Sequence, residues 1–412
     1  EAGTLTMMGY DGKAAKVLRS NDVINKATEE TANFLQTKFP SPRTNVFCLN
    51  PVAQHAPRFM MELEGFVAGL RAQINGSAGG RSGLTGEHFK PLLDREDVME
   101  ALLRVHRLII DGELPKWAHP YIVSQRLMSL GAKQRPICMG EFIARSCAAF
   151  VNATVSAGKD ETFFLRKIEG RYVCQFANSI SGGTEAMAHL IHTLVHDGDR
   201  GMVVVSDDGK NAYGALDRVN GCNVTTKLNP STHRWINWAY GTPAMMVHGD
   251  RVLWGQEGSY QGDPLGGRIH DTAFQPVLEE ASRLTATQFP LERVHVLAFR
   301  DDAYVVGPAT ASIYCHRQIK RLRKEKMNVD TAEDKIFAYC PVSSFLNDEP
   351  GYDAAKYVLA QHVGVEKVHH SGFTAVGIPI SEDSEFLDDF LQKCMEKYPK
   401  FLPRIEKGGA KT

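Results

Sequence analysis

Short apolar runs bounded by carboxylates constrain the fold of this 412-residue chain more than any other feature. Residues 202–205, Met-Val-Val-Val, are suited to a buried strand, and Asp208 follows this run closely. Two further runs, 294–299 and 303–307, are joined by Arg-Asp-Asp at 300–302, which predicts a β-hairpin with carboxylates at its tip. The chain is therefore expected to place charged groups at the ends of apolar strands.

Adjacent carboxylates such as Asp301 and Asp302 repel each other, which is costly at a structured strand end unless a cation neutralises them. Hard divalent ions suit such a site because they bind a few carboxylate oxygens and leave positions open for water and phosphate. Two ions about 3.5–4 Å apart activate the attacking oxygen and stabilise the leaving oxygen in phosphoryl transfer. Asp-Asp pairs are also common in ordinary turns, so the doublet alone leaves both interpretations open.

The overall charge gives no indication of a polyanionic partner. Lys plus Arg number 47 against 48 acidic residues, so binding to nucleic acid would depend on a local patch. The eight cysteines are widely spaced, which favours reduced buried thiols over a zinc site or disulfides. Because no apolar stretch approaches the roughly 18 residues of a membrane span, no membrane partner is expected.

Helical periodicity predicts helices over about 59–73 and 94–112, on either side of a Gly/Ser-rich break at 76–83. That break is either a flexible linker or a loop whose backbone must approach another group closely. A third helix, expected over 314–327, has an apolar inner face and a basic outer face. A basic outer face can follow phosphate groups, and it is equally typical of a helix that faces solvent.

Three motifs, at 208–218, 258–266 and 299–302, resemble motifs A, B and C of the reverse transcriptases of LINE-type, non-LTR retrotransposons. Further segments that resemble this family, in the expected order, are 82–90, 108–115, 135–137 and 372–380. The resemblance implies an α+β fold, a right-hand polymerase with fingers and palm, an antiparallel palm sheet, a helical N-terminal extension and a largely absent thumb.

The domain organisation implied by this resemblance is consecutive along the chain. The expected segments are an N-terminal extension of helix and loop at 1–95, fingers and first palm segment at 96–200, the palm with motifs A to C at 201–380, and a C-terminal helix leading toward a missing thumb at 381–412.

By the same resemblance, Asp208, Asp301 and Asp302 are the catalytic residues and the ligands of Mg²⁺ or Mn²⁺. Asp207 is an additional acid beside Asp208, but the spacing to Tyr213 favours Asp208 as the ligand. Arg300 departs from the family, whose members usually have a small or apolar residue at this position. Its guanidinium either pairs with the carboxylates and competes with metal, or points away from them.

The residues that the resemblance assigns to nucleotide binding are Lys133, Arg135, Tyr213, Gln261, Gly262 and Lys335. The ring of Tyr213 would collide with a 2′-hydroxyl, Lys133 and Arg135 would bind the triphosphate, and Lys335 would assist the leaving pyrophosphate. Gln261 and Gly262 would lie against the nucleotide and the template base. The alternatives are a core aromatic, solvated surface charges and an ordinary Gly-Asp-Pro turn.

The candidate nucleic-acid-binding residues are the basic side chains of the third helix, Arg317, Lys320, Arg321, Arg323 and Lys324. The implied activity is RNA-dependent DNA synthesis from an RNA template, a DNA primer and dNTPs, in an intracellular, nuclear location. The alternative is a related domain without activity, retained as a structural or RNA-binding part of a ribonucleoprotein. Tyr213 disfavours a third interpretation, an RNA-dependent RNA polymerase.

Overall fold

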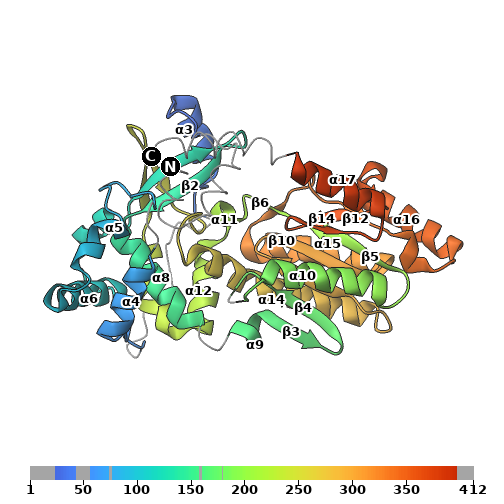
Figure 1. The fold of residues 1–412 in the computed structure, drawn as a ribbon, viewed down its shortest axis with the longest axis horizontal. Helices are drawn as coiled ribbons and strands as arrows, with labels where there is room; N and C mark the ends of the chain where they lie inside the picture. The colour runs from blue at the N-terminus through green and yellow to red at the C-terminus, as the bar shows by residue number, and fades with distance from the viewer. Residues whose placement is uncertain (1–23, 43–55, 74–76, 157–159, 179, 397–412) are drawn as a thin grey trace. The chain divides into compact units, whose positions relative to one another are not determined.

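The structure is a computed structural model that describes residues 24–42, 56–73, 77–156, 160–178 and 180–396. The chain divides into two compact units, each discontinuous in sequence. Unit 1 comprises 1–154, 225–266 and 391–412, and unit 2 comprises 155–224 and 267–390. Both units combine helices with a mixed β-sheet, which agrees with the α+β class expected from the sequence (Figure 1).

Unit 1 contains a four-stranded sheet in the order β2-β1-β7-β8. Its strands are β1 Gln125–Leu130, β2 Arg135–Gly140, β7 Ala244–His248 and β8 Arg251–Gly255. Its helices are α3 Glu29–Gln36, α4 Leu63–Ala72, α5 Gly86–Phe89, α6 Glu96–Ile110, α7 His119–Ile122, α8 Phe142–Ser156 and α13 His233–Tyr240. Short 3-10 turns occur at Lys90–Leu92, Lys116–Ala118 and Pro230–Thr232. The two helices predicted for this part of the chain are confirmed as α4 and α6.

The Gly-rich segment between α4 and α5 approaches other backbone closely, from residue 77 onward. A Cβ on Gly80 would lie 2.8 Å from the Cα of Glu141, so only glycine fits there. The backbone N–H of Ser82 donates to Oε1 of Glu141 at 3.1 Å. Residues 77–83 are therefore a packed loop, whereas residue 76 lies outside the described residues.

Unit 2 contains a seven-stranded sheet in the order β13-β12-β5-β10-β9-β4-β3. Its strands are β3 Leu165–Ile168, β4 Arg171–Gln175, β5 Met202–Asp207, β9 His295–Phe299, β10 Asp302–Pro308, β12 Ala338–Tyr339 and β13 Val368–His369. Two small pairs are β6 Gly209–Lys210 with β11 Asp330–Thr331, and β14 Phe373–Ala375 with β15 Ile378–Ile380. The predicted strand before Asp208 and the hairpin at 294–307 are confirmed as β5 and β9–β10.

The expectation of an antiparallel sheet is correct for most strand pairs of this sheet, including β3–β4 at one edge. β12, β5, β10 and β9 pair antiparallel, but β12–β13 and β4–β9 are parallel. Parallel neighbours require a crossover connection, which helix α16, Glu349–Val363, supplies between β12 and β13. The sheet is therefore mixed, with one parallel pair at the β13 edge and one inside the sheet.

The other helices of unit 2 are α9 Asp160–Phe164, α10 Gly183–His192, α11 Ala212–Ala215, α12 Arg218–Leu228, α14 Gly266–Gln288, α15 Ala309–Met327 and α17 Ser384–Met395. A π-helix at Thr193–Asp197 and 3-10 turns at Val342–Phe345 and Val365–Lys367 complete the set in the described residues. Of the expected C-terminal helix, α17 is described, and 397–412 lie outside the described residues.

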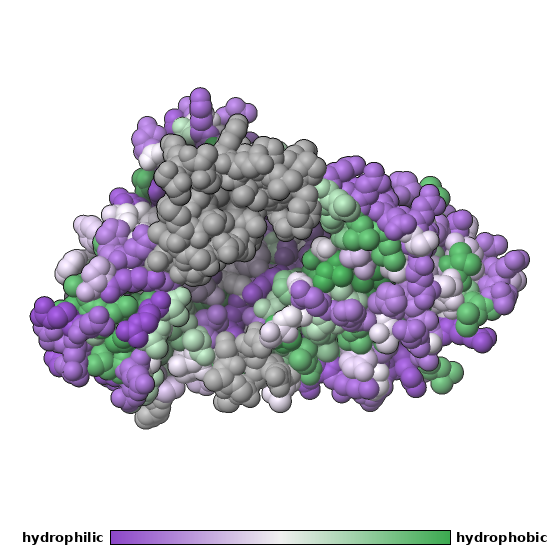
Figure 2. Space-filling model, viewed as in Figure 1, coloured by the Kyte–Doolittle hydropathy of each residue, from purple (hydrophilic) through white to green (hydrophobic). Residues whose placement is uncertain are grey.

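Side chains of β5 alternate between the two faces of the sheet. Met202 and Val204 pack with Ile191 of α10 in one hydrophobic cluster, whereas α15 packs on β5 and β10 (Figure 1). Asp207 therefore lies on the face opposite to these two residues, and Asp208 follows at the strand end. The surface of both units visible in Figure 2 is mainly hydrophilic, with smaller hydrophobic patches.

A buried ion pair joins α15 to β5. Both guanidinium Nη atoms of Arg323 donate to the carboxylate of Asp207, one of them at 3.0 Å, and His316 Nε2 lies 3.2 Å from Oδ1. Burial alone would raise the pKa of Asp207, but Arg323 and His316 outweigh burial and lower it. Arg323 is only 1% exposed, so its prediction as a nucleic-acid contact is wrong.

Six of the seven cysteines in the described residues are buried, and no disulfide joins any of them there. The eighth, Cys48, lies outside that part of the chain. Among the described helices none is both long and apolar enough to cross a membrane.

Replacing Arg323 by Met should lower the free energy of unfolding by about 3–5 kcal/mol, because it leaves Asp207 buried without its charged partner. The matched control is Arg321→Met, which removes an exposed pair with Glu325 and should cost less than about 1 kcal/mol. Urea denaturation at neutral pH measures both losses. Equal losses for the two variants would contradict a structural role for the buried pair.

Candidate functional site

The three predicted carboxylates lie together at one end of the central strands of unit 2. In the register of β5 and β10, Ala303 pairs with Asp207, so the next position brings Asp302 beside Asp208. Asp301 lies in the turn between β9 and β10. The negative charge of Asp208 acts on both residues of the doublet, which confirms that the three groups are close in space.

Mutual repulsion and burial perturb this cluster. Burial, followed by the charges of Asp301 and Asp208, raises the pKa of Asp302 to about 7. Burial also raises the pKa of Asp301, with Asp208 adding to the effect and His270 opposing it. The ammonium of Lys335 lies 2.8 Å from both carboxylate oxygens of Asp208 and supplies positive charge to the cluster.

The surplus of negative charge fits the cluster to a hard divalent cation, because carboxylate oxygens are its preferred ligands. In the part of the chain that the structure describes, no three His, Cys, Asp or Glu side chains are arranged so as to hold a metal ion. Asp208 instead faces Lys335, the residue that the resemblance associates with pyrophosphate. The fit to a cation thus rests on charge and donor type.

The pleat of β5 places the adjacent residues Asp207 and Asp208 in different environments. Asp207 is fully buried against Arg323, whereas the side chain of Asp208 is 19% exposed and faces Lys335. Neighbouring residues in a strand point to opposite faces. Of these two carboxylates, only that of Asp208 is accessible beside the turn of the hairpin.

Arg300 points away from the two carboxylates that follow it. Its guanidinium donates to Asp271 of α14 and lies 3.4 Å from Oδ1 of Asn178. Its backbone N–H donates to the side-chain oxygen of Gln175, whose amide nitrogen donates back to the carbonyl of Arg300, both at 2.9 Å. Of the two sequence hypotheses, competition with metal is not the arrangement observed.

Sequence reasoning missed Gln175 and Asp271, because neither belongs to a segment with carboxylate-rich or glycine-rich character. Gln175 is the last residue of β4, and Asp271 lies within α14, 29 residues before Arg300. A buried polar residue at a strand end is a weak signal in sequence. Only the pairing of β4 with β9 brings Gln175 to the turn.

Tyr213 lies in α11, and its ring stacks on His270 of α14 with centroids 5.3 Å apart. Burial raises the pKa of Tyr213, and the charge of Asp271 adds to the effect. The negative charges of Asp301 and Asp302 also raise the pKa of Tyr213. The aromatic ring is therefore part of the same electrostatic neighbourhood as the doublet.

Lys133 and Arg135 lie at the turn and the first strand residue of the β1–β2 hairpin in unit 1. Both side chains are exposed, and Gln134 between them adopts a positive φ of 48°. The predicted fingers hairpin is thus a hairpin with basic side chains at its tip. This is compatible with phosphate binding and with ordinary solvated charge.

Gly262 has a packing reason to be glycine. Its φ is +121°, and a Cβ there would lie 2.2 Å from the carbonyl oxygen of Cys138 in β2. The N–H of Cys138 also donates to the carbonyl of Gln261 at 2.8 Å. The close approach expected here is therefore met by protein backbone, and a ligand is not required to explain the glycine.

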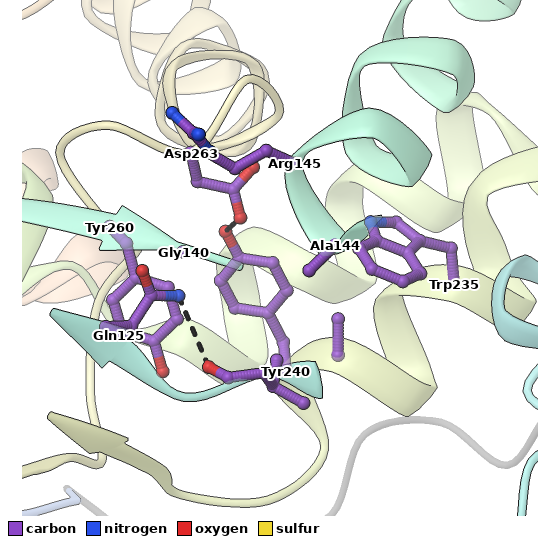
Figure 3. A pocket seen from close by; sticks show the side chains of 10 residues that line it. Gln125, Gly140, Ala144, Arg145, Trp235, Tyr240, Tyr260 and Asp263 are labelled. Carbon is purple, nitrogen blue, oxygen red and sulfur yellow. Dashed lines mark hydrogen bonds between the residues drawn. The ribbon is translucent and has the colours of Figure 1, made fainter. Parts of the chain in front are cut away.

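The turn after Gln261 is held by aromatic residues that the sequence did not single out. The hydroxyl of Tyr240 donates to Asp263 at 2.7 Å, and the rings of Tyr240 and Tyr260 stack with centroids 5.3 Å apart (Figure 3). Burial raises the pKa of Asp263. The pocket beside these residues is also lined by Gln125 and Trp235.

The remaining basic candidates on α15 are exposed: Arg317, Lys320, Arg321 and Lys324. Three of them form ion pairs with nearby acids, Lys320 with Glu333, Arg321 with Glu325 and Lys324 with Asp330. Exposed pairs of this kind contribute little to stability. They also reduce the net positive charge that the helix offers to phosphate.

Neither protein-family models nor curated proteins provide a match for this chain.

The raised pKa of Asp302 predicts a pH-dependent stability in the absence of divalent cations. Between its ordinary value of 3.8 and about 7, the folded state binds more protons than the unfolded state, so stability falls as the pH rises. From about pH 5 to 7, the loss should reach at most about 2 kcal/mol. Asp302→Asn should flatten this decline because it removes the titrating group.

Urea denaturation in the presence of a chelator, at several pH values in this window, measures the decline. Asp330→Asn is the control, since Asp330 is paired with Lys324 on the surface. A decline of the same steepness in the parent and in Asp302→Asn would contradict the raised pKa assigned to Asp302.

Proposed function

We propose that this chain is an RNA-dependent DNA polymerase of a non-LTR retroelement, which adds nucleotides from dNTPs to the 3′-hydroxyl of a DNA primer on an RNA template. The observation that carries the proposal is the meeting of Asp208 with Asp301 and Asp302 at the ends of β5 and β10. The order of the motifs that resemble reverse transcriptases supports it, as does the aromatic residue five positions after Asp208.

In this proposal, Asp208, Asp301 and Asp302 hold Mg²⁺ or Mn²⁺. When bound, the cation activates the primer hydroxyl and offsets negative charge that develops on the transferred phosphate. Lys335 supplies positive charge next to Asp208, where it would help to orient the triphosphate and the departing pyrophosphate.

Selection of deoxyribonucleotides is assigned to Tyr213. Its ring is fixed by stacking on His270, so it would resist displacement by a sugar that carries a 2′-hydroxyl. Lys133 and Arg135 are proposed to bind the triphosphate, and Gln261 and Gly262 to line the nucleotide site. Exposed Arg317, Lys320, Arg321 and Lys324 remain candidates for contact with the template or primer backbone.

The second candidate function is a non-catalytic domain of the same type, retained in a ribonucleoprotein. It is favoured by the ion pair of Lys335 with Asp208 and by the acidic partners of the basic residues on α15. Against it stands the electrostatic cost of keeping Asp301 and Asp302 together, which a purely structural role would not require. Either function is proposed for a nuclear setting.

Asp301→Asn should abolish Mg²⁺-dependent primer extension on a defined RNA template while the protein stays folded, because the variant loses a proposed metal ligand. Asp330→Asn, an equivalent change at an exposed ion pair, should retain activity. Circular dichroism and unfolding curves establish equal folding of the three proteins. Extension by Asp301→Asn at the parent's rate would refute the catalytic assignment, and no extension by the parent would favour the non-catalytic function.

Tyr213→Val should admit ribonucleotides, because removal of the ring opens space for the 2′-hydroxyl. The readout is the ratio of kcat/KM for an rNTP to that for the matching dNTP, expected to rise by about tenfold or more. Tyr314→Val is the control, because Tyr314 packs on Phe289 elsewhere in unit 2. Preserved dNTP activity with an unchanged ratio would mean that Tyr213 serves only in packing.

A further inference from the structure

Asp271 is the common partner of three polar side chains around the carboxylate turn. Asp271 belongs to α14, and its side chain is fully buried. One carboxylate oxygen accepts from Arg300 and from Nδ2 of Asn178 at 2.7 Å, and the other accepts from Nδ1 of His270 at 3.0 Å. A buried carboxylate with charged and polar donors on both oxygens has a defined orientation.

The first turn of α14 leaves room for the Arg300 guanidinium to reach this carboxylate. A Cβ on Gly267 would lie 2.6 Å from Nη1 of Arg300, so a side chain there would displace the guanidinium from its present position. Gly267 therefore lets the guanidinium pass over bare backbone toward Asp271.

The ion pair fixes the backbone of the turn. Arg300 has a φ of +60°, a conformation that L side chains adopt rarely. The two hydrogen bonds with Gln175 hold its peptide groups, and the bond to Asp271 holds its side chain. Because Asp301 is the next residue, the same anchors fix the start of the proposed metal site.

The Arg300–Asp271 ion pair is also connected to the ring of Tyr213, through His270. His270 donates to Asp271 and stacks on Tyr213 with an interplanar angle of 30°. Rotation of the Asp271 carboxylate would therefore release the imidazole that supports the tyrosine ring. One buried carboxylate is in this way connected both to the turn and to the residue proposed to select the sugar.

We propose that the Arg300–Asp271 ion pair is a specificity-determining positioning element, which holds Tyr213 through His270 and so sets the discrimination between deoxyribonucleotides and ribonucleotides. This inference rests on the proposed polymerase function. Arg300 and Asp271 act here through other residues, so they are positioning residues and not catalytic ones.

The test uses shape-conserving variants, Asp271→Asn and Arg300→Met, together with the double variant. Each single change should raise the rNTP-to-dNTP ratio of kcat/KM by about tenfold, within the range expected for groups coupled in one network. The double variant should show no greater effect than the larger single one, because either change breaks the same pair. Arg166→Met is the matched control, since it removes an exposed ion pair with Glu279 on the same helix.

The variant His270→Phe distinguishes a loss of support for the Tyr213 ring from a general loss of structure. It keeps an aromatic ring for Tyr213 but cannot donate to Asp271, so its ratio should rise as in Asp271→Asn. A merely structural role would lower kcat/KM for both nucleotides in proportion and leave the ratio unchanged, which would overturn the inference. Unfolding curves for each variant identify loss of folding separately.

The outcomes distinguish this inference from the function on which it rests. Synthesis by the parent with an unchanged ratio in all three single variants overturns the positioning role alone. Absence of synthesis by the parent overturns the proposed function and the inference together. A raised ratio in these variants, with the Arg166→Met ratio equal to that of the parent, supports both.

Discussion

The antiparallel pairing of β5 with β10 is the constraint on which the candidate site depends. Pleating sends Asp207 under α15 and leaves Asp208 at the strand end, although the two residues are adjacent in sequence. The same pairing brings the turn of the β9–β10 hairpin beside Asp208. A shift of one residue in this register would exchange the buried and the accessible carboxylate.

The aspartates of unit 2 lie in two kinds of environment: buried ion pairs and the cluster at the strand ends. Asp207 and Asp271 are fully buried, and each is matched by an arginine and a histidine. In the described part of the chain, the three groups at the strand ends have one lysine as ion-pair partner, Lys335, which pairs with Asp208. Buried ion pairs define orientation, whereas surplus charge at an accessible strand end is suited to a cation. The near-neutral net charge of the chain conceals this local difference.

The position of Arg323 in the helical period of α15 indicates that its side chain is buried, although the basic composition of the helix suggested exposure. Arg323 lies four residues after Ile319 and four before Met327, both fully buried, so it belongs to the apolar face of the helix. The exposed residues Lys320, Arg321 and Lys324 occupy the other face. Its residue type suggested that Arg323 belongs to the basic, exposed face of the helix, but its position in the helical period places it on the buried face.

By itself, the sequence determined β5, the β9–β10 hairpin, helices α4, α6 and α15, and the positions of Asp208, Asp301 and Asp302 at the strand ends. These features follow from local patterns of apolar residues, turns and chain order. Only the tertiary structure decided the parallel pairs of the sheet, the partner of Arg300 and the close backbone neighbour that requires glycine at position 262. The physical reason is that these depend on contacts between residues far apart in sequence, which are defined only when helices and strands have packed.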